Sequence, residues 1–178
     1  MQLYVPYTQI LSATLKSLTQ YEFTIIKMDS DDSYLEYFQT RWQDASSFIN
    51  CEHDTVFHSQ AIEELAACPE PWCAFAVDGN DVTIGGGLPP TLSTLKPFSQ
   101  GGAPPLCLMK FDQNFILRFP HLWADAKGWS DLPSWHYLDA YLDWYTKGKD
   151  VVCHQHYPNV INANGMYREK IKALRGDL

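Results

Sequence analysis

The sequence predicts an α/β fold in which a mostly parallel sheet is flanked by helices. Segments with strand character alternate with segments of helical periodicity through the first 77 residues. That order is typical of parallel strands joined by right-handed helical crossovers. The chain has 178 residues, of which 46% are hydrophobic and 14% aromatic, which is enough for one domain with a full core. We therefore expect a single domain over residues 1–178.

Strands and helices alternate strictly in the first half of the chain. The strands are short runs rich in apolar residues that end at polar segments. The second helix opens among Ser and Asp residues that can cap it and places Leu35, Phe38 and Trp42 on its apolar side. Prolines stop the third helix. The predicted order is strand 1–8, helix 11–18, strand 21–29, helix 30–44, strand 48–57, helix 58–68 and strand 72–77.

A long loop is predicted between the two halves of the chain. Residues 78–105 concentrate Gly, Pro, Ser and Thr with little periodicity, and a loop of this length is usually functional or partly disordered. In the second half, Asp112 can begin a short helix, and apolar residues at helical spacing mark a longer one that ends near Gly148. The predicted order is strand 106–111, helix 112–120, helix 134–148, strand 150–162 and a basic helical tail over 166–178.

Charge and cysteine content exclude several classes of protein. The formal net charge of -8 disfavours a broad electrostatic grip on nucleic acid. The five cysteines are not spaced as a CxxC pair and indicate neither a disulfide framework nor a zinc ribbon. The chain opens without a basic leader and has no apolar run long enough to span a membrane. We expect a cytoplasmic protein with reduced thiols and no membrane partner.

Ionisable residues cluster where the third predicted strand leaves the core. Glu52, His53 and Asp54 interrupt an apolar run, and burying unpaired charge is costly. Because ligands of parallel α/β sheets bind beyond the carboxyl ends of the strands, we expect a ligand crevice here and at Asp29. Alternate residues of an extended segment face the same way, so Glu52 and Asp54 could hold one divalent cation. The competing interpretation is a solvated charge at Glu52 and a turn or helix cap at Asp54.

Three residues of the second half are further candidates. Asp139 lies on the predicted helix 134–148, where it could serve a site or simply face solvent with Asp143 one turn further on. His154 and His156 alternate in an extended segment and would share one face.

These segments resemble the motifs of GT-A glycosyltransferases. "IIKMD" followed by acids, an Arg-bearing helix with "TRW", and "FINCEHD" look like the nucleotide-binding half, where an acidic D-x-D-like element follows such a helix. "WHYLD" resembles the acceptor-side helix with the catalytic carboxylate of inverting members, and "VVCHQHYP" the late segment that can complete the metal site. Glu52 replaces the first Asp of the usual motif. The set is similar to compact glycosyltransferase-like proteins encoded by phages.

The resemblance implies a GT-A-like, Rossmann-like domain that transfers a sugar from a nucleotide-sugar, expected to be UDP-linked, to a hydroxyl. It divides the chain into a donor-binding half at 1–77, the loop at 78–105 and an acceptor-side half at 106–178. A bound Mn²⁺ or Mg²⁺ would stabilise the departing diphosphate, and Asp139 would take the acceptor's proton. The residues implied for the metal are Glu52, Asp54, His154 and His156, and those implied for the donor are Asp29, Arg41 and Asp54.

Other functions fit the same residues. The acids and histidines could bind a metal that activates water in a hydrolase or phosphoesterase, or the six Trp and ten Tyr could serve a non-catalytic carbohydrate- or nucleotide-binding phage module. We expect His53 and His136 to be structural. The resemblance also allows a hydroxymethylated base in phage DNA as acceptor, within the host cytoplasm. The phosphate contacts would then come from Lys96, Lys110, Arg118 and Lys127.

Overall fold

The computed structural model of the chain describes residues 1–78, 106–151 and 153–162. The long loop expected after residue 78, Lys96 within it, and the helical tail expected at 166–178 lie outside the described residues.

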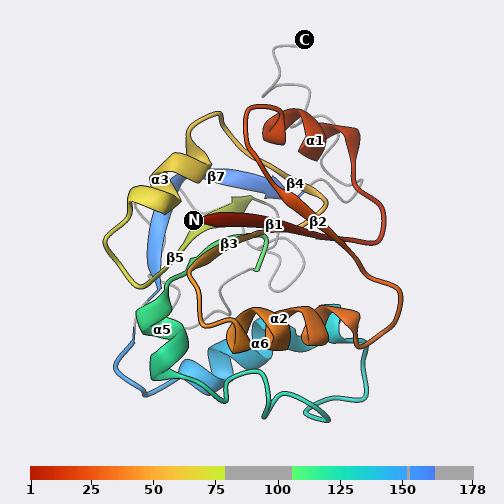
Figure 1. Cartoon of the computed structure of the whole chain (residues 1–178), viewed down its shortest axis with the longest axis vertical. Helices are drawn as coiled ribbons and strands as arrows, with labels where there is room; N and C mark the ends of the chain where they lie inside the picture. The colour runs from red at the N-terminus through yellow and green to blue at the C-terminus, as the bar shows by residue number, and fades with distance from the viewer. Residues whose placement is uncertain (79–105, 152, 163–178) are drawn as a thin grey trace.

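A seven-stranded sheet forms the centre of the described structure (Figure 1), in the order β2-β1-β3-β6-β5-β7-β4. The pairs β1–β2, β1–β3 and β5–β7 are parallel, whereas β6 runs antiparallel to both β3 and β5, and β4 antiparallel to β7. All strands except β6 and β4 therefore run in one direction, which confirms a mostly parallel sheet. The strands are β1 (Gln2–Tyr7), β2 (Thr24–Lys27), β3 (Phe48–Cys51), β4 (Thr55–Val56), β5 (Trp72–Asp78), β6 (Leu108–Phe111) and β7 (His154–Asn162).

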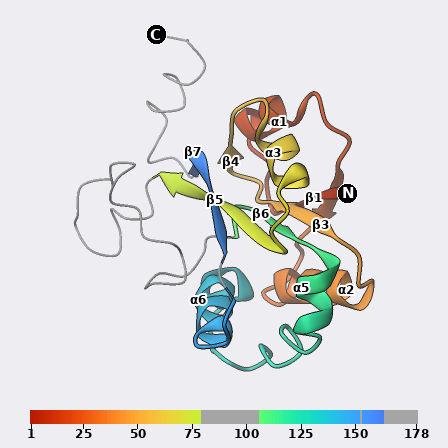
Figure 2. The same ribbon diagram turned by 90° about the vertical axis from the view of Figure 1, so that its left-hand side faces the viewer.

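Helices cover both faces of the sheet, which confirms the α/β class. Figures 1 and 2 show α1 and α3 on one face and α2, α5 and α6 on the other. Each of these helices was predicted within a few residues of its observed bounds. The helices are α1 (Ser12–Leu18), α2 (Ser33–Gln43), α3 (Ala61–Ala67), α5 (Gln113–Arg118) and α6 (Ser134–Thr146).

Two hydrophobic cores lie on the opposite faces of the sheet. Leu3 and Val5 of β1 pack with residues of α1 and α3, whereas Tyr4 between them packs with residues of α2 and α6. Phe48 and Ile49 of β3 divide in the same way. This alternation is the consequence of strand geometry, in which neighbouring side chains point to opposite faces. The central strands are apolar on both faces, which explains why they read as continuous apolar runs.

Local signals place the helix ends in the second half of the chain. The Asp112 side chain accepts a hydrogen bond from the backbone N–H of Phe115 at 3.0 Å, which confirms Asp112 as the cap of α5. After α6, Gly148 has a φ of +76°, a left-handed conformation that glycine adopts at little cost. The helix accordingly ends at Thr146, close to the predicted position.

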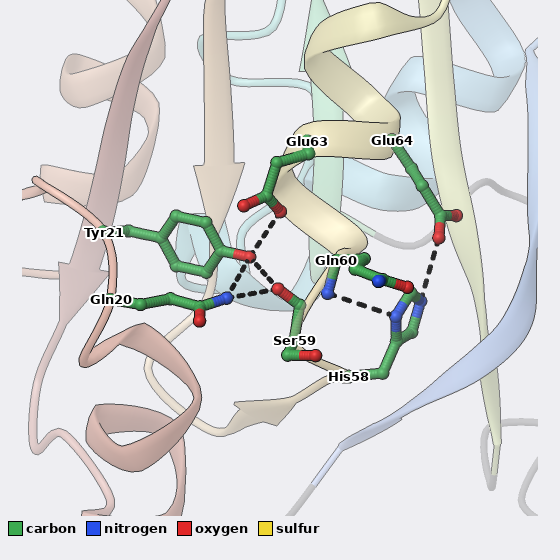
Figure 3. Close-up of polar contacts among 7 residues, drawn as sticks. All are labelled: Gln20, Tyr21, His58, Ser59, Gln60, Glu63 and Glu64. Carbon is green, nitrogen blue, oxygen red and sulfur yellow. Dashed lines mark hydrogen bonds and ion pairs between the residues drawn. The ribbon is translucent and has the colours of Figure 1, made fainter.

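Polar contacts fasten the start of α3 to the segment that precedes β2 (Figure 3). The Tyr21 hydroxyl lies 2.5 Å from Glu63 Oε2 and also contacts the carbonyl oxygen of Ser59. Burial and the hydrogen bond to Glu63 raise the pKa of Tyr21 to about 12. On the other side of α3, His58 Nε2 lies 3.9 Å from Glu64 Oε1. These contacts hold α3 over the sheet without any ligand.

Candidate active site

A cavity of about 620 Å³ lies at the carboxyl ends of β1, β2 and β3, beside the first turns of α2 and α6. Open α/β sheets bind ligands at this kind of position. Three carboxylates line the cavity, those of Glu52, Asp54 and Asp139. Two of them follow β3 in sequence, and the third comes from α6 in the second half of the chain. The fold therefore unites acids that are more than 80 positions apart in the sequence.

A turn presents the first two acids to the cavity. The prediction of one extended strand over 48–57 is wrong, because β3 ends at Cys51 and the backbone N–H of Thr55 bonds the carbonyl oxygen of Glu52 at 3.1 Å. This i to i+3 bond closes a turn. Cys107 anchors it, since its carbonyl oxygen accepts bonds from the Glu52 N–H at 2.8 Å and the Thr55 hydroxyl at 3.2 Å. Glu52 and Asp54 therefore meet in the cavity through the turn, and not through strand alternation.

A buried network of hydrogen bonds positions the Glu52 carboxylate. The Tyr34 hydroxyl donates to Glu52 Oε1 at 2.7 Å, and Asn50 Nδ2 donates to the Tyr34 hydroxyl at 3.4 Å. The Tyr37 hydroxyl completes the network with a 3.0 Å bond to Asn50 Oδ1. Burial, and then the charge of Asp54, raise the pKa of Glu52 above its ordinary value. The network fixes one carboxylate oxygen of Glu52, so the geometry of this acid is set before any ligand binds.

Asp139 reaches the cavity because α6 is tied to the start of α2. The backbone N–H and the hydroxyl of Ser134 both donate to the carbonyl oxygen of Asp31, at 2.8 and 2.7 Å. The backbone N–H of Leu106 donates to Asp139 Oδ1 at 3.1 Å. Burial, and then the charge of Glu52, raise the pKa of Asp139 to about 8. Without a ligand, this carboxyl therefore holds its proton at neutral pH.

The acids form a donor set that suits a hard divalent cation. Carboxylates that crowd one partly buried cavity repel each other, and the raised pKa values of Glu52 and Asp139 express that repulsion together with burial. A cation of charge +2 would relieve both effects, and Mg²⁺ and Mn²⁺ take oxygen ligands of this kind. The donor set therefore fits the metal that the sequence resemblance implies.

Two residues that the sequence assigned to the donor lie outside the cavity lining. Asp29 is exposed and lies 2.6 Å from Lys27 Nζ, one residue beyond Met28, which does line the cavity. Arg41 lies near the far end of α2, where it donates to the Tyr4 hydroxyl at 2.6 Å and pairs with Asp44 at 3.0 Å. Asp29 directly follows the cavity residue Met28, so it could contact a ligand that extends beyond the cavity. Arg41 is instead engaged by Tyr4 and Asp44.

The two predicted histidine ligands lie on β7, away from the acids. Neither His154 nor His156 lines the cavity. Their alternation in an extended strand is confirmed, and their ring centroids are 4.8 Å apart. His154 Nδ1 lies 3.2 Å from Cys68 Sγ. Burial, and then the neighbouring His154, lower the pKa of His156 to about 4. The structure thus separates the predicted metal set into two acids at the cavity and two histidines beside a cysteine.

The described residues that were expected to contact DNA phosphates differ in their exposure and in their hydrogen-bond partners. Lys110 is only 2% exposed and donates to the carbonyl oxygen of Cys68 at 2.5 Å, so the expectation that it contacts phosphate is wrong. It sits on β6 between β3 and β5, where strand burial leaves it no path to solvent. Arg118 donates to the carbonyl oxygens of Lys149 and Asp150. Lys127 is exposed.

Sequence patterns did not point to several residues at the cavity. Tyr34 counts as part of the apolar side of α2, although its hydroxyl holds Glu52. Tyr34 and Tyr37 are three residues apart and therefore lie on one face of the helix. Together with the polar Asn50 inside an apolar strand, this spacing could have predicted the network. His53 and His136, which were expected to be structural, both line the cavity. Trp135 lines it too and is 45% exposed.

No protein-family model matches the chain, and no curated protein matches it in sequence. Its structure is similar to that of a glycosyltransferase involved in the glycosylation of the major capsid of PBCV-1. The TM-score is 0.54 with 8% identity over 97% of this chain and 98% of that chain. It is also similar to a putative glucose-1-phosphate thymidylyltransferase from Bacillus anthracis, solved in complex with a sucrose. There the TM-score is 0.50 with 10% identity over 99% of this chain and 76% of that chain.

These similarities support a glycosyltransferase-like fold. At such low identities they establish the architecture alone, so the chemistry has to be argued from the cavity. Within the described residues, no helix is both long and apolar enough to cross a membrane.

Proposed function

We propose that the chain is a metal-dependent glycosyltransferase that moves a sugar from a nucleotide-sugar, with UDP as the expected nucleotide, to an acceptor hydroxyl. The observation that carries this proposal is the convergence of Glu52, Asp54 and Asp139 on one cavity. The cavity lies at the strand ends of a glycosyltransferase-like sheet. A volume of about 620 Å³ falls in the range of small-molecule sites.

Glu52 and Asp54 are the residues that would hold the cation, Mn²⁺ or Mg²⁺. The bound ion would neutralise negative charge on the departing diphosphate. Tyr34 keeps Oε1 of Glu52 in a hydrogen bond, and the Cys107 thiol also hydrogen-bonds this carboxylate, so the acid is oriented before an ion binds. His154 and His156 take no part in this site, because they lie on β7 beside Cys68.

Asp139 would act as the general base that accepts the proton of the acceptor hydroxyl. Its Oδ1 atom is fixed by the backbone N–H of Leu106, so its second oxygen is available to the acceptor. Asp139 can accept a proton only in its ionised form, and its pKa of about 8 would fall when a cation binds beside it. With a cation bound, Asp139 would be ionised at neutral pH and able to accept the proton. Asp143 does not line the cavity, which favours Asp139 between the two acids of α6.

The acceptor would enter beside the first turn of α6. Trp135 and His136 line the cavity next to Asp139 and are both exposed. An exposed indole offers a stacking surface for a sugar ring or a nucleobase. A hydroxymethylated base in phage DNA is therefore one acceptor to assay, alongside glycans, proteins and small molecules.

The proposal is tested by binding first and by transfer second. Nucleotide-sugars with different bases are screened by thermal shift, with and without Mn²⁺. We expect stabilisation by a UDP-sugar that depends on the metal, because a ligand that binds only the folded chain raises its apparent stability. Any nucleotide-sugar that stabilises the chain is then incubated with each acceptor class. The proposal would be overturned if no nucleotide diphosphate or nucleotide-sugar stabilised the chain. Release of free sugar or phosphate without any transfer would favour the hydrolase alternative.

A further inference from the structure

A second group of metal-ligand side chains lies apart from the cavity, at Cys68, His154 and His156. One ligand atom from each, the thiol sulfur and a ring nitrogen of either histidine, lies within 4.8 Å of the other two. Cys68 Sγ and His154 Nδ1 are 3.2 Å apart. In a tetrahedral zinc site, bond lengths of about 2.3 Å to sulfur and 2.0 Å to nitrogen place ligand atoms roughly 3.3 to 3.6 Å from one another. The separation of Cys68 Sγ and His154 Nδ1 is close to this spacing, and the His156 ring nitrogen lies within 4.8 Å of both atoms.

From this arrangement we propose that Cys68, His154 and His156 bind a zinc ion, in a site distinct from the acidic cavity. The ligand types select the metal. A thiolate with two imidazoles suits Zn²⁺, whereas Mg²⁺ and Mn²⁺ prefer the oxygen ligands of the cavity. One chain would thus carry a borderline-soft site and a hard site.

The backbone holds all three ligands in place before any metal binds. Cys68 ends α3, where its N–H bonds the carbonyl oxygens of Glu64 and Leu65 at 3.0 and 3.3 Å. His154 and His156 are alternate residues of β7, which pairs with β5. They therefore face the same side at a fixed separation. A preorganised ligand set of this kind keeps the ordering cost of binding low.

The His156 ring provides a second sign that a ligand is missing from its surroundings. Its Nε2 atom is buried and has no hydrogen-bond partner among the residues that the structure describes. The ring packs against Phe75, with centroids 5.2 Å apart. Leaving a buried polar nitrogen unpaired costs free energy, and a metal bound at Nε2 would give this atom a partner and remove that cost.

Charge and exposure define the remaining features of the site. The ammonium group of Lys110 lies 2.5 Å from the Cys68 carbonyl oxygen, so positive charge is already present. Two neutral imidazoles would leave the full +2 charge of zinc near Lys110. The anionic thiolate of Cys68 reduces that net charge to +1, so the cysteine is needed in the ligand set. His154 is exposed, and this leaves a route for the metal and room for water as the fourth ligand. Zinc would tie the end of α3 to β7.

Cobalt substitution separates this site from the acidic cavity. The full chain with Glu52→Gln and Asp54→Asn, which removes the carboxylate ligands, is titrated with Co²⁺ and then with Zn²⁺. We expect one Co²⁺ per chain, with a sulfur-to-metal charge-transfer absorption that carboxylate ligands cannot produce, and its loss when Zn²⁺ displaces cobalt. This readout requires no nucleotide-sugar and no activity, so it is independent of the proposed function.

Single substitutions test each ligand. Cys68→Ser should abolish the charge-transfer absorption, and His154→Gln should lower zinc affinity by more than the roughly 10- to 100-fold that loss of an outer-sphere partner causes. His154 is exposed, so this variant should fold even where a change at Cys68 does not. His121→Gln replaces another exposed histidine and should leave zinc affinity unchanged. A cobalt complex without thiolate absorption, or equal zinc affinity in the His154 and His121 variants, would overturn the proposal.

Discussion

Two polar regions of the protein differ in how their acids are partnered. At the start of α3, Glu63 receives the Tyr21 hydroxyl, Glu64 faces His58, and Gln20 donates to the Tyr21 hydroxyl at 2.7 Å (Figure 3). Across the cavity, burial and then the charge of Asp54 raise the pKa of Glu52, and burial and then the charge of Glu52 raise the pKa of Asp139. In the first region, each glutamate faces a side chain of the fold, Tyr21 or His58. In the second region, three carboxylates share one cavity, and neighbouring acids raise the pKa of Glu52 and Asp139.

Under the proposed function, this difference separates acids that serve the fold from acids that serve a ligand. An acid paired with a donor contributes modestly to stability and needs no further partner. Acids that crowd a partly buried cavity raise the free energy of the folded state, and perturbed carboxylates of this kind gather at functional sites. Substitutions in the two regions should therefore have opposite consequences for stability and activity.

The largest effect is expected at Asp139. Asp139→Asn keeps an oxygen that can accept the Leu106 N–H bond but removes the base. We expect turnover to fall about 100-fold or more, the usual range for general-base catalysis, with donor affinity nearly unchanged. Single-turnover transfer and calorimetric donor binding measure the two quantities.

Asp143→Asn is the matched control for that experiment, because Asp143 lies one turn further along α6 and outside the cavity lining. Its turnover should equal that of the wild type. Undiminished transfer by the Asp139 variant would remove Asp139 from the mechanism.

A smaller effect is expected at Asp54, in the binding of the nucleotide. Asp54→Asn removes one charge at nearly constant volume and should weaken Mn²⁺-dependent UDP binding at least tenfold, or about 1.4 kcal/mol. Calorimetry with and without Mn²⁺ measures the change. Its folding stability should not fall, since the substitution relieves repulsion with Glu52. Equal UDP affinity in the variant and the wild type would exclude Asp54 from the metal site.

The cavity acids also predict how stability depends on pH. The folded-state pKa of Asp139 is about 8, above the value of about 3.9 in an unfolded chain. The folded state therefore binds the extra proton, and stability from this group is lost as the pH rises from about 4 through about 8. Asp139→Asn should flatten this decline and be more stable than the wild type at pH 9, by at least about 1 kcal/mol. Urea denaturation from pH 6 to 9 without metal measures it, and an unchanged slope in the variant would contradict the assignment.

Much of this fold could be predicted because its elements carry local signals. Apolar runs give the strands, and the Asp112 cap and Gly148 mark helix ends in the sequence itself. The turn at Glu52 was missed because polar residues follow an apolar run in two cases, when the strand continues to a polar end and when a turn begins. Composition alone does not distinguish the two. The short strand β4, which the turn introduces, was missed with it.

Other features depend on contacts between distant segments, which no local pattern encodes. Asp139 meets Glu52 only because Ser134 ties α6 to Asp31 and the Leu106 N–H fixes the carboxylate. Lys110 is part of an apolar strand, and only the strand order shows that both neighbours bury it. The histidines were correctly expected to share a face, yet the thiol that contacts the His154 ring belongs to Cys68, 86 positions away.

The smallest effect is expected in the polar contacts at the start of α3. Tyr21→Phe removes the hydroxyl that contacts Glu63 and Ser59 but keeps the ring that packs near Phe57, with centroids 6.4 Å apart. A partly exposed hydrogen bond of this kind contributes roughly 0.5 to 1 kcal/mol, so the free energy of unfolding should fall by about that amount. Nucleotide binding and transfer should not change, because neither partner lines the cavity. Urea denaturation beside a transfer assay measures both. A Tyr21 variant that loses donor affinity at unchanged stability would show that this network also serves the ligand, and the distinction between the two regions would then fail.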